Sequence, residues 1–147
     1  ILGAIGAHES TGGENLNHKT VKDKHSMHYG HTAGGPFGMM PITASEVIIR
    51  DKGLSSKYPD LAALAKDVKG NHHKITEMLN TNPEAAVSLA ESLLNHNKSK
   101  KLSDNELIHS WNHGLTGTLH ARKTGDVGMD DYVKAVNSKR APASKEK

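Results

Sequence analysis

Residues 82–95, NPEAAVSLAESLLN, decide the fold class of this 147-residue chain. Asn82 followed by Pro83 is a typical helix start, because the asparagine side chain caps the helix and proline suits the first helical position. The apolar residues that follow form one stripe at helical spacing: Ala86, Leu89, Ala90, Leu93 and Leu94. We therefore expect a helix that packs this stripe into the core.

Helical patterns continue on both sides of this stretch. Ser103-Asp104-Asn105-Glu106 is a capping box that opens a helix through Trp111. Thr43 is the expected N-cap of a helix through about residue 52, which Gly53 would end. Further helical segments are expected at residues 1–10, 59–68, 72–79, 116–123 and 130–138. Since no window alternates as a buried strand does, the sequence predicts an all-α fold.

Length and composition indicate one domain, which we expect to cover residues 1–139, followed by a charged, disordered tail at residues 140–147. No run approaches the roughly 18 apolar residues of a membrane span. There is no cysteine, so disulfides and thiolate metal sites are excluded. The opening at Ile1 is what we expect of a processed form or of a domain of a longer protein.

The net charge of +3 and the pI near 9.1 predict mild attraction to polyanions, including bacterial cell wall. The basic residues are scattered and aromatic side chains are scarce, so we do not expect a nucleic-acid partner. The charge alone does not choose among the other polyanions.

Glu9 is the candidate catalytic residue. It follows an apolar segment and precedes Thr11-Gly12-Gly13, which is expected to end the first helix. Glycosidic cleavage needs a carboxylic acid that stays protonated near neutral pH. Desolvation at an apolar helix end favours that form. An ordinary surface role is the alternative, so the neighbouring motifs decide.

Four short blocks supply that context: AHES at residues 7–10, GGPFGMMPITA at 34–44, WNHG at 111–114 and DYVKAV at 131–136. In order and spacing they resemble the signature blocks of the lytic transglycosylase and goose-type lysozyme families. The resemblance covers about residues 1–138. Pro41 stands where the family usually has Gln, and Trp111 where it usually has Tyr.

This resemblance implies a lysozyme-like helical domain with a saccharide-binding groove and no cofactor. Glu9 would be the general acid and base that cleaves the bond between N-acetylmuramic acid and N-acetylglucosamine in peptidoglycan. A lytic transglycosylase needs only this carboxylate, because the 6-hydroxyl of the muramic acid attacks its own anomeric carbon and leaves a 1,6-anhydro end. The substrate-binding residues implied by the motifs are Ser10, Gly38, Met39, Met40, Asn112 and Tyr132.

Two other functions stay open. A goose-type muramidase would hydrolyse the same bond with a second acid from the long polar loop at residues 11–36, where the acids are Glu14 and Asp23. A non-catalytic wall-binding module, such as part of a phage virion, would keep the fold without the chemistry. All three predict action in the periplasm or cell wall, by a secreted or virion-associated protein.

Metal binding is the rival from another class, since the chain has eleven histidines and spaces three of them regularly as His25-x-x-His28-x-x-His31. No HExxH motif accompanies them, and Gly30 makes it unfavourable for these three histidines to lie on one helix. We therefore expect no metal site.

Overall fold

The computed structural model describes residues 1–125 and 127–140. In these residues the chain forms eight α-helices and one 3-10 helix, with two isolated β-bridges and no strand. The predicted all-α class is therefore confirmed. The elements are α1 (Leu2–Ser10), α2 (Pro41–Arg50), α3 (Lys52–Lys57), α4 (Pro59–Ala65), α5 (Val68–Thr81), α6 (Pro83–Lys98), α7 (Asp104–Thr124), η1 (Val127–Met129) and α8 (Asp131–Asn137).

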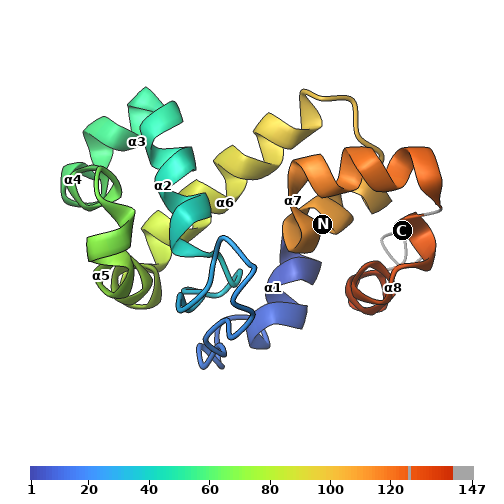
Figure 1. The fold of residues 1–147 in the computed structure, drawn as a ribbon, viewed down its shortest axis with the longest axis horizontal. Coiled ribbons are helices and arrows are strands. Elements are labelled where there is room, and N and C mark those ends of the chain that lie inside the picture. The colour runs from blue at the N-terminus through green and yellow to red at the C-terminus, as the bar shows by residue number, and fades with distance from the viewer. Residues whose placement is uncertain (126, 141–147) are drawn as a thin grey trace, which may run out of the picture.

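Helix α6 joins two groups of helices (Figure 1). On one side α2, α4 and α5 pack on one another, and on the other side α8 packs against both α7 and α1. Helix α6 contacts members of both groups. The long segment between α1 and α2 lies between the groups, so it is placed to shape any groove there.

Each group has its own apolar core. The first centres on Val47, Ile48, Ile75 and Leu89, all completely buried. The second is smaller and consists of Ala4, Ile5, Ile108, Val133 and Val136. Phe37 and Trp111 pack against both cores. The predicted stripe of α6 contributes Ala86, Leu89 and Ala90 to the first core, with Leu93 packed against it.

Side-chain caps start the two helices that were clearest in the sequence. Asn82 Oδ1 accepts the backbone N–H of Ala85 at 3.1 Å. Ser103 Oγ accepts the N–H of Glu106 at 3.2 Å, while Glu106 Oε1 accepts the N–H of Ser103 at 2.8 Å. Both predicted helix starts are confirmed, because these signals depend only on residues three apart.

The region around residues 41–57 differs from the prediction. Helix α2 begins at Pro41, two residues before the expected cap Thr43, because proline occupies the first turn without needing a hydrogen-bond partner. Gly53 does not end a helix but lies inside α3. Asp51 starts that extra helix by accepting the N–H of Leu54 at 3.2 Å.

Three other boundaries also shift. The expected segment 59–68 ends earlier, at Ala65, and Val68 already belongs to α5. Segment 72–79 is the middle of α5, which Asp67 caps. Residues 116–123 are not a separate helix but continue α7 across a kink at Gly114, where φ is 79° and ψ is 161°. Essentially only glycine adopts this conformation.

The C-terminal end of the described chain is anchored. Arg140 Nη2 donates to Asp104 Oδ2 at 3.1 Å, although we predicted that the disordered tail starts at Arg140. The remainder of that predicted tail, residues 141–147, lies outside the described residues. Within the described part of the chain, none of the helices combines the length and the apolar character that crossing a membrane requires.

Candidate functional site

Glu9 lies in the last turn of α1 and contacts Tyr132 of α8. The Tyr132 hydroxyl donates to Glu9 Oε2 at 2.8 Å. Burial, together with the negative charge of Glu9, raises the pKa of Tyr132 far above its usual value, so the phenol remains a hydrogen-bond donor. The first and last of the four sequence blocks, 123 residues apart in the chain, therefore meet at one carboxyl group.

Gly38 brings the second block against the same carboxyl group. Its φ of +61° lies in the left-handed region that favours glycine. A Cβ atom added there would lie 2.9 Å from Glu9 Oε1 and 3.0 Å from Glu9 Cδ. The absence of a side chain at Gly38 thus lets the loop approach the acid closely.

Further hydrogen bonds hold the blocks and the loop together. Trp111 Nε1 donates to the carbonyl of Phe37 at 2.9 Å, which joins the third block to the second. Ser10 Oγ lies 2.6 Å from the Pro36 carbonyl oxygen and accepts the N–H of Gly13 at 2.8 Å. Ser10, expected to bind sugar, is only 1% exposed, so its contacts are within the fold and position the loop.

A cleft of about 570 Å³ opens beside Gly38. Of the expected substrate-binding residues, Gly38, Met39, Met40 and Asn112 line it, whereas Ser10 and Tyr132 do not. Asn112 is exposed, Met40 is half-buried, and Met39 is buried and also belongs to the first core. The volume lies within the range of small-ligand sites. Its lining combines apolar groups with a few polar ones.

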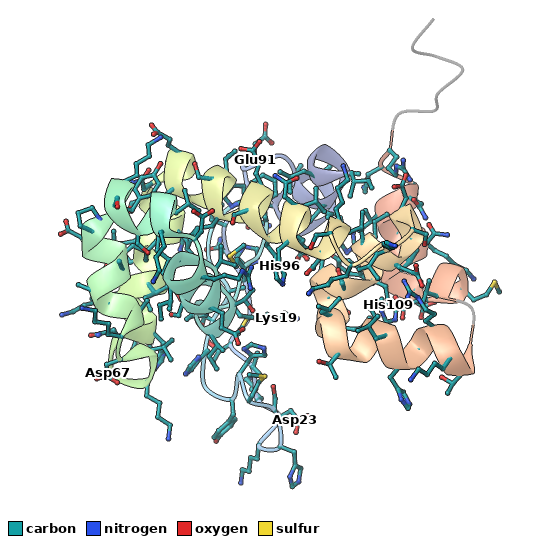
Figure 2. All side chains as sticks on the ribbon, turned by 90° about the horizontal axis from the view of Figure 1, so that it is seen from above. Lys19, Asp23, Asp67, Glu91, His96 and His109 are labelled. Carbon is teal, nitrogen blue, oxygen red and sulfur yellow. The ribbon has the colours of Figure 1, made fainter. Side chains whose placement is uncertain are left out.

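The two acids expected from the loop are not part of this lining. Asp23 lies near the tip of the loop (Figure 2), where its carboxylate accepts the backbone N–H of His25 at 2.9 Å. Glu14 is exposed in the turn after α1. Among the described residues, the carboxylate that lines the cleft is Glu46 of α2, which was not predicted from the sequence. Its i,i+3 spacing from Thr43, another lining residue, was the available signal.

Histidines from the loop pack against histidines of α5. The rings of His31 and His72 stack with centroids 4.2 Å apart, and those of His72 and His73 are 4.0 Å apart. In the described part of the chain, the Nδ1 atoms of His28, His31 and His72 are buried without a hydrogen-bond partner. His25 is exposed, and its ring nitrogens do not converge with those of His28 and His31 on a common point.

This cluster predicts a pH-dependent stability. Burial lowers the pKa of His28, His31 and His72, and neighbouring histidines lower the last two further, whereas Glu46 partly opposes the shift at His28. The unfolded chain therefore binds more protons than the folded chain once the pH falls below about 6.5. The stability that the neutral histidines contribute is fully present above that pH and is lost as the pH falls below it. We expect the melting temperature to fall between about pH 7.5 and pH 5, and to fall less in His72→Gln.

The matched control for this measurement is His120→Gln on α7, an exposed position outside the cluster. It should keep the wild-type pH dependence in differential scanning fluorimetry. An equal fall in all three proteins would show that the cluster does not cause the effect.

Comparison of the chain with known protein families, with curated proteins and with solved structures gave no match.

Proposed function

We propose that this domain cleaves the glycan strands of peptidoglycan as a lytic transglycosylase, with Glu9 as the general acid and base. One observation carries the proposal: Tyr132 and Gly38, from two separate blocks, meet at the two oxygens of the Glu9 carboxyl group. A surface glutamate would not need a half-buried phenol on one oxygen and a side-chain-free backbone on the other.

The geometry supports a division of labour between the two oxygens of Glu9. Oε2 accepts the Tyr132 hydrogen bond, which leaves Oε1, on the Gly38 side, to carry the catalytic proton. Glu9 donates this proton to the glycosidic oxygen as the bond to the anomeric carbon breaks. The resulting carboxylate then removes the proton of the muramic acid 6-hydroxyl, whose oxygen bonds to the anomeric carbon and closes the 1,6-anhydro ring.

The cleft beside Gly38 provides the groove for the glycan strand. Asn112 is placed to hydrogen-bond an acetamido group, since its exposed amide offers both a donor and an acceptor. Met40 offers an apolar wall for a sugar face. The substrate places the site of action in the periplasm or cell wall, reached by a secreted protein or by a phage virion.

Mass spectrometry of the muropeptides released from purified sacculi tests the proposal. We expect products with 1,6-anhydro ends, one water lighter than reducing ends, from the wild-type domain, and about 1,000-fold slower release of the same products from Glu9→Gln. Release of nothing by the folded wild-type domain would contradict the proposal and favour a non-catalytic wall-binding module.

Hydrolysis is the second candidate function. Because Glu46 lines the cleft and the loop acids do not, Glu46 is the better candidate for the second carboxylate that hydrolysis would use. A muramidase places a second carboxylate near the acid to activate water. If reducing ends are released, Glu46→Gln should slow their release about 100-fold, as expected for loss of a general base. Asp23→Asn is the matched control and should leave the rate unchanged. If Asp23→Asn slowed the release and Glu46→Gln did not, the second acid would be the loop residue Asp23.

A further inference from the structure

Two histidines of α7 and one aspartate form a cluster beside the proposed catalytic site. His109 and His113 are four residues apart on the helix, and their rings stack with centroids 4.1 Å apart. Asp130, the N-cap of α8, places Oδ1 3.0 Å from His113 Nε2. One ligand atom from each of the three residues lies within 4.8 Å of the other two.

The kink at Gly114 brings a further side chain onto this cluster. In a straight helix, residues nine apart are separated by about 13.5 Å along the axis. Yet Thr118 Oγ1 lies 2.7 Å from Nδ1 of His109, nine residues earlier. The break at Gly114 therefore folds the second half of α7 back toward the first and brings a completely buried hydroxyl onto a buried histidine.

Hydrogen bonds from neighbouring groups hold His109 and Asp130 in place, as outer-shell hydrogen bonds hold the ligands of metal sites. In the tautomer in which Nδ1 of His109 carries the proton and donates to Thr118, the Nε2 lone pair is free to bind an ion, which is the usual outer-shell arrangement for a histidine ligand. Asp130 is also fixed, since its Oδ2 accepts the N–H groups of Tyr132 at 3.0 Å and Val133 at 3.2 Å. Its Oδ1 is the oxygen that faces His113.

We propose that His109, His113 and Asp130 bind a zinc ion. Two imidazoles and one carboxylate are a ligand set that zinc accepts, with a fourth position left for water. The ion would take the place of the proton between His113 Nε2 and Asp130 Oδ1, which lie 3.0 Å apart. His113 also lines the cleft, which gives the ion a path from solvent. From the sequence we expected no metal site, and the only candidate ligands were the loop histidines His25, His28 and His31.

The site is separate from the proposed glycosidic chemistry, and its occupancy can be measured without substrate. It is nevertheless linked to Glu9 through one chain of contacts. Asp130 holds the backbone of Tyr132, whose hydroxyl donates to Glu9. An ion bound by Asp130 would therefore stiffen the first turn of α8, on which Tyr132 lies.

Isothermal titration of the metal-free chain with zinc chloride, followed by cobalt chloride with absorption spectroscopy, tests the proposal. We expect one zinc ion per chain and a cobalt spectrum of four-coordinate type. His113→Gln should weaken binding at least tenfold, because removing a direct ligand costs no less than removing an outer-shell partner. Asp130→Asn should do the same, and it retains an oxygen that can cap α8.

His120→Gln is the matched control, because it removes an exposed histidine from the same helix. It should bind zinc as the wild type does. Circular dichroism establishes that each variant is folded. Wild-type affinity in both folded His113→Gln and folded Asp130→Asn would overturn the proposal, as would the absence of zinc binding by the wild type.

Discussion

The Glu9→Gln variant is expected to release soluble muropeptides about 1,000-fold more slowly than the wild type, because it lacks the only group proposed to move the proton. Its fold should persist, since the amide oxygen still accepts the hydrogen bond that Tyr132 donates to Glu9 Oε2. Tyr132→Phe, which removes that bond but leaves the acid, should cost only about tenfold. The activities of the wild type and the two variants are compared by the rate at which each releases soluble products from labelled sacculi.

Glu91→Gln supplies the matched control for this experiment. Glu91 is an exposed glutamate of α6 on the opposite side of the molecule from the loop that carries Asp23 (Figure 2). The same chemical change there should leave the rate unchanged. Substantial activity in folded Glu9→Gln would mean that another carboxylate carries the proton.

The Gly34→Ala variant is expected to lower the free energy of unfolding by about 1–3 kcal/mol, the usual cost of overpacking. The added Cβ would lie 2.7 Å from the Thr76 carbonyl oxygen and 2.9 Å from Leu79 Cβ, both on α5. The loop cannot retreat freely, because Thr76 Oγ1 donates to the Thr32 carbonyl at 2.6 Å. Chemical denaturation at equilibrium measures the difference.

Gly34 also pairs with Met39 through two backbone hydrogen bonds of 2.9 and 3.1 Å, so displacing it should move Gly38 away from Glu9. Gly3→Ala is the matched control. A Cβ at Gly3 meets no atom within 4 Å, and alanine in a helix should raise stability by about 0.5–1 kcal/mol. Equal stability of the two variants would show that Gly34 is not tightly packed.

Local signals account for what the sequence predicted correctly about the helices. The Asn82 cap, the capping box at Ser103 and the stop at Thr11-Gly12-Gly13 each depend on residues within one or two helical turns. Such signals are read without knowledge of the rest of the fold. Gly53 was wrongly predicted to end a helix, because Asp51, two residues earlier, caps a new helix that includes Gly53.

The residues of the candidate site likewise include some that were predicted from the sequence and others that were found only in the structure. Glu9, Gly38 and Tyr132 were identified from their sequence blocks, and the structure brings these three residues together. The buried position of Ser10, the place of Glu46 in the cleft lining and the cluster of His109, His113 and Asp130 were not predicted. Each of these depends on where a distant segment packs.

The sequence by itself determined the helical class, the principal helix starts and the residues proposed for catalysis. Tertiary structure alone decided what surrounds them. The kink at Gly114 places Thr118 on His109, and packing of α8 on α1 places Tyr132 on Glu9. The physical reason is range: caps and periodicity act over a few residues, whereas burial and close approach depend on contacts between segments that only the folded chain brings together.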